Sequence, residues 1–162
     1  MMRANPDCPH CDGTAWKPVD RNGVKAVERC SCFQHNQRES LSEHASIPGH
    51  FRDVDFNNFS PGSPSKNPIA HEALIKVMLG ARAYARSYPA LPQLGLLLQG
   101  PTGVGKTHLA TAVLKQLISR GFSCAFFDYQ TLLDQIRQSY NSAAGVIDKH
   151  AYQSVLDTEI VL

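Results

Sequence analysis

The sequence carries little excess charge of either sign and no long apolar run. Its 162 residues include 16 basic and 14 acidic side chains, for a formal net charge of +2. This balance neither requires nor excludes a nucleic-acid partner, because a small basic patch can sit within a nearly neutral total. No apolar run approaches the roughly 18 to 20 residues that a membrane-spanning helix needs. We therefore expect no membrane association.

The amino-terminal stretch lacks the apolar segment of a secretory signal. Met1 to Pro6 leads instead into Cys, Pro and His. We therefore expect a cytoplasmic location, where clustered cysteines are more often metal ligands than disulfides. The composition, 43% hydrophobic and 19% charged, is typical of a soluble globular protein. The length suffices for one sizeable core, or for a small module followed by part of a larger domain.

Four of the five cysteines form two close pairs. The pairs are Cys8-x-x-Cys11 and Cys30-x-Cys32, and two such turns can close a tetrahedron of thiolates around Zn²⁺. Because about 36 residues have too little core to fold alone, zinc would supply the folding energy of a zinc-ribbon module over residues 1–36, with a short ribbon between the cysteine pairs. His10 or His35 could replace one ligand. The alternative is a redox dithiol at Cys8 and Cys11, which leaves the second pair without a role.

The segment between the cysteine pairs contains a possible nucleic-acid contact. Trp16 has basic neighbours, Lys17, Arg21, Lys25 and Arg29, which together could stack on bases and contact phosphates. The simpler interpretation is a tryptophan packed over the zinc turns with solvated neighbours, since acidic residues dilute the charge. We favour the simpler interpretation. Residues 37–66 are expected to be a connecting segment that ends in a Pro- and Gly-rich loop.

Helical and apolar segments alternate over the remainder, residues 67–162. Asn67 followed by Pro68 predicts a capped helix start, and short apolar runs are typical of buried parallel strands. The pattern predicts helices over 67–88, 106–120 and 131–140, and strands over 94–99, 122–128 and from 159 onward. Strands alternating with helices indicate an α/β fold with a parallel sheet and flanking helices.

A glycine-rich loop joins the predicted strand 94–99 to the helix that follows. Its residues match Gly-x-x-x-x-Gly-Lys-Ser/Thr in full: Gly100, Pro101, Thr102, Gly103, Val104, Gly105, Lys106 and Thr107. Glycines let several backbone N–H groups converge on phosphate oxygens, and the helix N-terminus favours the same anion. Lys106 would reach the β- and γ-phosphates, and the Thr107 hydroxyl would bind Mg²⁺. We predict ATP and Mg²⁺ binding, and include the adjacent His108 without a catalytic role.

Three features together resemble those of the DnaC/DnaI-like helicase loaders. They are the two cysteine pairs, the 47–59 stretch, and the glycine-rich loop with its continuation through Lys106, Thr107 and His108. The loaders are AAA+ ATPases of the P-loop NTPase class, related to the IstB-type transposition ATPases. The resemblance implies that Gly100 to Thr107 form a Walker A loop and that the Ile47 to Phe59 stretch lines the adenine side. It implies a DnaB-type replicative helicase and single-stranded DNA as partners, and self-assembly through the AAA+ domain.

In that family the stretch ending at Leu162 would lead into the Walker B strand, whose acidic residues hold Mg²⁺ and orient water. We therefore expect a carboxyl-terminally incomplete AAA+ domain that binds ATP, with hydrolysis expected in the full-length protein and catalytic residues unknown. The alternatives are an IstB-like ATPase that regulates transposition, a non-hydrolysing zinc-containing interaction protein, and, remotely, a small-molecule kinase.

Overall fold

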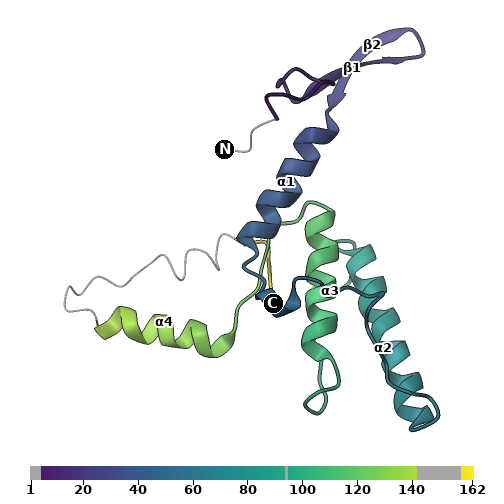
Figure 1. Ribbon diagram of the computed structural model, residues 1–162, viewed down its shortest axis with the longest axis vertical. Coiled ribbons are helices and arrows are strands. Elements are labelled where there is room, and N and C mark those ends of the chain that lie inside the picture. The colour runs from purple at the N-terminus through teal and green to yellow at the C-terminus, as the bar shows by residue number, and fades with distance from the viewer. Residues whose placement is uncertain (1–4, 94, 142–157) are drawn as a thin grey trace.

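The computed structural model describes residues 5–93, 95–141 and 158–162, with the side chains of Gln135, Ile136 and 138–141 left out. A β-hairpin and the cysteine turns lie at one end of the long helix α1, and the remaining elements lie at its other end (Figure 1). The predicted strand start at Leu94 and the 142–157 part of the predicted ATP-binding domain lie outside the described residues. Among the described helices, none is long and apolar enough to cross a membrane.

The amino-terminal hairpin consists of strands β1 (Trp16–Arg21) and β2 (Val24–Arg29), paired antiparallel with Arg21 opposite Val24. Asn22 and Gly23 form the turn with φ of +56° and +81°. Positive φ at both central residues is the geometry that matches the twist of a two-residue hairpin, and Asn-Gly supplies it at low cost. The hairpin lies between the two cysteine pairs, where the zinc-ribbon prediction for residues 1–36 places a short ribbon.

Helix α1 (Ser31–His44) was not predicted. It runs through position 36, so the boundary that we predicted between the zinc module and the connecting segment falls inside a helix. Most of the helix is exposed, and Leu41 is its buried residue. Its carboxyl-terminal end is held by the next residue, because the Ala45 carbonyl accepts a hydrogen bond of 2.8 Å from the Phe126 N–H. A short 3-10 helix, η1 (Gly49–Phe51), follows.

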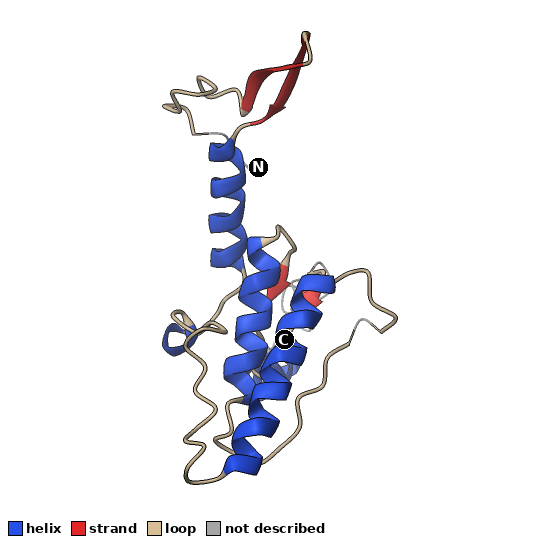
Figure 2. Ribbon diagram, turned by 90° about the vertical axis from the view of Figure 1, so that its right-hand side faces the viewer, coloured by secondary structure: helices blue, strands red, loops and turns tan. Residues whose placement is uncertain are grey.

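The core lies around helices α2 (Pro68–Ser87) and α3 (Lys106–Ser119), which pack side by side (Figures 1 and 2). Both agree with the predicted ranges. The Asn67 side chain caps α2 by accepting the Ala70 N–H at 3.0 Å. Ala81 and Ala85 are 2% and 0% exposed, and such small residues allow close helix approach. Three leucines of α3 are buried against them: Leu109, Leu114 and Leu117.

The parallel sheet is shorter than predicted. Strands β3 (Cys124–Ala125) and β4 (Ile160–Val161) form a parallel pair beside the end of α1 (Figure 2). Helix α4 (Tyr129–Asn141) follows β3 (Figure 1). The strand predicted over 94–99 is wrong for the described residues 95–99, which form no strand. A strand exists only with a hydrogen-bonded neighbour, and the described sheet consists of β3 and β4. The apolar side chain of Leu97 is accordingly 86% exposed.

Candidate functional site

The glycine-rich loop adopts a backbone that only glycine takes without strain. The φ angles of Gly100, Gly103 and Gly105 are +154°, +84° and +89°. Residues with a Cβ pay steric energy in this region. All three glycines therefore adopt backbone conformations that residues with a Cβ disfavour, as we predicted from the motif.

The loop leads directly into a helix N-terminus. Gly105 is the N-cap of α3, and no side chain caps the first turn. The free N–H groups of a first turn attract anions, and the helix dipole adds to the attraction. The Lys106 ammonium donates a hydrogen bond of 2.8 Å to the Pro101 carbonyl, so it lies across the loop. Thr107 is exposed beside it. The arrangement offers a cation, a hydroxyl and backbone donors to one phosphate chain.

An open cavity of about 680 Å³ lies next to the loop. Lys106 and Thr107 line one part of it, and the remainder is lined by residues of α2 and α3 and of the 95–98, 126–129 and 159–162 segments. Asp128 also lines it, but its carboxylate caps α4 by accepting the Thr131 N–H at 2.9 Å. That backbone hydrogen bond lowers the pKa of Asp128. The volume is within the range of small-molecule sites, roughly 300 to 1,000 Å³.

Phe59 and His108 pack beside the loop, and their mutual contact was not predicted. Their rings meet edge to face at a centroid distance of 5.3 Å. The Nε2 atom of His108 lies 2.9 Å from the Asp55 carbonyl oxygen, which can only accept, so Nε2 carries the hydrogen. His108, included in the predicted nucleotide-binding set, therefore contacts the 55–59 segment. The adenine contact predicted for the 47–59 stretch stays a prediction.

Gly105→Ala tests how tightly the loop is packed. A Cβ at Gly105 would lie 2.6 Å from Cε2 of Phe59, at a φ that already disfavours alanine. We expect the substitution to lower stability by about 2 kcal/mol or more and ATP affinity by roughly tenfold or more. Thermal unfolding and titration with a fluorescent ATP analogue measure the two effects.

The matched control is Gly121→Ala at the end of α3. Gly121 has a similar φ of +95°, but a Cβ there would meet nothing within 4 Å. It therefore reports the backbone strain without the collision with the ring. Equal losses of stability and affinity in both variants would contradict the predicted role of the Gly105–Phe59 contact.

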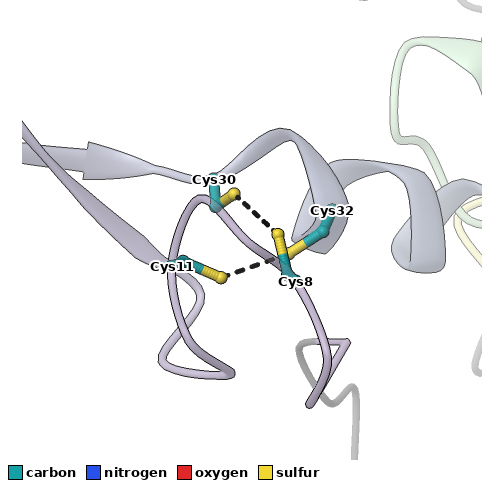
Figure 3. Close-up of side chains that lie close together, drawn as sticks. All are labelled: Cys8, Cys11, Cys30 and Cys32. Atoms are coloured by element: carbon teal, nitrogen blue, oxygen red, sulfur yellow. Dashed lines mark hydrogen bonds between the residues drawn. The ribbon is translucent and has the colours of Figure 1, made fainter.

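The four predicted ligand cysteines come together at the base of the hairpin (Figure 3). Their Sγ atoms all lie within 4.8 Å of one another. Cys8 and Cys30 are 3.7 Å apart at sulfur, and Cys11 and Cys32 are 3.5 Å apart. A tetrahedral zinc with Zn–S bonds of about 2.3 Å requires sulfurs about 3.8 Å apart. The residues therefore fit a four-cysteine zinc centre, and their thiols are free rather than disulfide-bonded.

Local backbone turns bring each pair to the cluster. The Cys8 carbonyl accepts the N–H groups of Cys11 and Asp12, and the Cys30 carbonyl accepts that of Phe33. The second turn is also the start of α1, whose positive dipole end favours thiolates. The Cys32 backbone N–H and the neighbouring thiols lower the pKa of Cys30, whereas, against an opposing backbone hydrogen bond at Asn5, burial and the same neighbouring thiols raise the pKa of Cys32. Neighbouring thiols thus favour one thiolate and disfavour the next, and a bound Zn²⁺ would supply the positive charge that lets all four deprotonate.

The two histidines offered as replacement ligands lie outside the sulfur cluster. The four cysteines form the group of donor atoms that could hold a metal among the described residues. The His35 ring instead lies 3.1 Å from a Glu39 carboxylate oxygen, one turn along α1. A closed set of four thiolates leaves no open coordination position, so such a zinc would be structural rather than catalytic.

Trp16 is partly exposed and packs against Arg29, and its packing over the zinc turns stays a prediction. Its side chain is 43% exposed, and the Arg29 guanidinium lies 4.0 Å from its ring centroid and 4.4 Å from that of Phe33. Glu28 pairs with Lys17 at 2.7 Å and with Arg21 at 3.5 Å. Two of the basic neighbours of Trp16, Lys17 and Arg21, are thus paired with an acidic side chain.

Comparison with known proteins identifies the carboxyl-terminal part. Residues 92–162 match the family described as IstB-like ATP binding protein. This part is similar to the DnaC/IstB-like ATP-binding proteins. The matched region contains the glycine-rich loop and helix α3, so the resemblance seen in the sequence is confirmed. The similarity implies a P-loop NTPase fold, which agrees with the α/β elements observed. No solved structure matches the chain.

Three curated relatives are similar at low identity. An uncharacterized protein, YqaM of Bacillus subtilis, is 24% identical over 75% of this chain and 38% of its own length. The replicative helicase loader DnaC of Buchnera aphidicola is 24% identical over 58% of this chain and 38% of its own length. A putative ATP-binding protein of insertion sequence IS5376 from Geobacillus stearothermophilus is 31% identical over 41% of this chain and 26% of its own length. The matched regions thus span less than two fifths of each relative.

Proposed function

We propose that the chain binds ATP with Mg²⁺ through the Gly100 to Thr107 loop and acts in DNA replication, as part of a AAA+ protein that loads a replicative helicase onto single-stranded DNA. The observation that carries nucleotide binding is the loop geometry: three glycines at positive φ followed at once by the N-terminus of α3. The similarity to a protein named as a helicase loader supports the cellular role.

The residues divide the work of binding between them. Backbone N–H groups of Gly103, Val104 and Gly105 would surround the phosphates, and the Lys106 ammonium would exchange the Pro101 carbonyl for phosphate oxygens. The Thr107 hydroxyl would hold Mg²⁺, which neutralises phosphate charge when bound. Hydrolysis requires a positioned water and further metal ligands in addition to this loop.

The four-cysteine module would serve as the contact region for a DnaB-type helicase or for single-stranded DNA. It holds the hairpin apart from the nucleotide loop on helix α1 (Figure 1), where a macromolecule can reach it. Exposed apolar residues, Val24 and Val27, lie on the hairpin at 66% and 67% exposure. We further propose that the chain self-assembles through its AAA+ domain and that it is located in the cytoplasm.

The second candidate is an IstB-like ATPase that regulates DNA transposition. Two observations favour it: the family model that matches residues 92–162 is the IstB-like one, and the relative with the highest of the three identities is an insertion-sequence protein. The cysteine module is the feature that favours the loader, because it resembles the amino-terminal module of the DnaC/DnaI-like proteins.

Co-purification with the host's DnaB-type helicase separates the two candidates. The loader proposal predicts that the chain, in the presence of MgATP, retains the helicase and that Cys8→Ser abolishes retention by dismantling the zinc module. Cys124→Ala, a substitution of the cysteine outside the cluster, should leave retention intact. Binding of duplex DNA with no retention of the helicase would contradict the loader and favour the transposition protein.

A further inference from the structure

Residues 52–59, here called the strap, follow helix α3 toward its N-terminus. The ammonium of Lys115, in the third turn of α3, donates a hydrogen bond to the Arg52 carbonyl. Two turns nearer the loop, the His108 ring donates to the Asp55 carbonyl at 2.9 Å. The strap then reaches Gly105 through the Phe59 ring. Its chain direction is therefore opposite to that of α3, and it ends against the phosphate loop.

Internal hydrogen bonds make the strap a defined structure rather than a loose connection. The Asp55 carboxylate accepts the N–H groups of Asn57 and Asn58. The Asn58 side chain makes two more hydrogen bonds within the strap. Its oxygen accepts the Asp55 N–H at 2.9 Å, and its amide donates to the Asp53 carbonyl at 2.6 Å. Three apolar side chains anchor it in the core: Val54, Phe56 and Phe59, each less than 10% exposed.

The far end of the strap determines the surroundings of the loop's last glycine. Phe59 fills the space that a side chain at Gly105 would need, with Cε2 only 2.6 Å from the position of a Cβ. The same ring packs edge to face on His108, in the first turn of α3. Phe59 and His108 thus support the peptide units between Gly105 and His108, whose N–H groups point toward the predicted phosphate site.

We propose that Phe59 and His108 are positioning residues for the nucleotide: through the Asp55 carbonyl and Gly105, the strap holds the phosphate loop in its binding conformation. This inference rests on the proposed ATP binding. A loop that samples the binding conformation for a smaller fraction of the time has its apparent affinity lowered by that fraction. By linkage, bound nucleotide would in turn order the strap.

The test compares two α3 side chains that hold the same strap at different distances from the loop. His108→Ala should weaken binding of a fluorescent ATP analogue with Mg²⁺ by about tenfold. His108→Gln, whose amide can still donate to the Asp55 carbonyl, should restore affinity to within about twofold of the unmodified chain. Lys115→Ala removes the distant anchor and should also stay within about twofold, even where it lowers the melting temperature as much as His108→Ala does.

A second variant, Phe59→Leu, keeps an apolar side chain in the core and should weaken nucleotide binding by several-fold. It tests the same inference if His108→Ala does not fold. Unchanged affinity in His108→Ala and Phe59→Leu, equal weakening in Lys115→Ala, or no restoration by His108→Gln would overturn the inference while leaving ATP binding intact. Absence of MgATP binding by the unmodified chain would instead overturn the proposed function and the inference together.

Discussion

We expect Lys106→Ala to weaken ATP binding by about a hundredfold or more. The lysine is the cation that the loop would direct at the phosphates, and in the structure its ammonium donates to a neutral acceptor, the Pro101 carbonyl, at 2.8 Å. A charged phosphate oxygen is a stronger acceptor than a carbonyl, so the ammonium gains from the exchange. Equilibrium titration with a fluorescent ATP analogue and Mg²⁺ measures the loss.

The control for this substitution is a lysine on the neighbouring helix. Lys76 is exposed on α2 and pairs only with Glu72, at 2.7 Å, among the interactions described. Lys76→Ala should therefore leave nucleotide affinity unchanged and report any effect of net charge alone. Retention of normal affinity by a folded Lys106→Ala variant would remove the assignment of the loop as a phosphate site.

We expect Cys30→Ser to prevent zinc binding and to unfold the amino-terminal module. Cys30 is completely buried and is one of the four clustered thiols, and serine supplies no thiolate there. Structural zinc contributes roughly 10 to 16 kcal/mol to the folding of comparable small modules at pH 7. We expect elemental analysis to find about one zinc per chain before the substitution and almost none after it. Loss of the hairpin signals in an NMR spectrum would accompany the loss of metal.

Two comparisons make the zinc prediction specific. Cys124→Ala should keep the full zinc content, because Cys124 lies in β3 and not in the cluster. Acidification should release zinc from the unmodified chain, because protons compete with the metal for thiolates, so affinity falls as pH falls. A chain purified without chelator that holds no zinc at neutral pH would contradict the four-cysteine centre.

Local sequence signals predicted the parts of the fold that depend on near neighbours. Asn67 and Pro68 define the start of α2, and Gly121 follows the end of α3 with a φ of +95°, because caps act within one helical turn. The cysteine cluster was predictable for a similar reason, since two tight turns fix four sulfurs in pairs. Conversely, α1 has a single buried residue, Leu41, and so shows no apolar periodicity that sequence reasoning could detect.

The features that escaped prediction depend on distant partners. Residues 95–99 are apolar enough for a strand, yet strand formation depends on a hydrogen-bonded neighbour that composition does not reveal. The stretch ending at Phe59 was recognisable by its aromatic residues, but neither its course along α3 nor its contact with Gly105 follows from the residue types. His108 was assigned to nucleotide because of its place in the motif, whereas its hydrogen bond reaches Asp55, 53 positions away in sequence.

Helix α1 acts geometrically as a lever arm. Its 14 residues span about 21 Å at 1.5 Å per residue, with the cysteine module at one end and the Ala45–Phe126 hydrogen bond at the other. A tilt of about 10° at the Ala45 end would displace the cysteine end by roughly 3.5 Å over that length. The Ala45 end lies beside β3, so a tilt of that size would move the hairpin by several ångströms relative to helices α2 and α3.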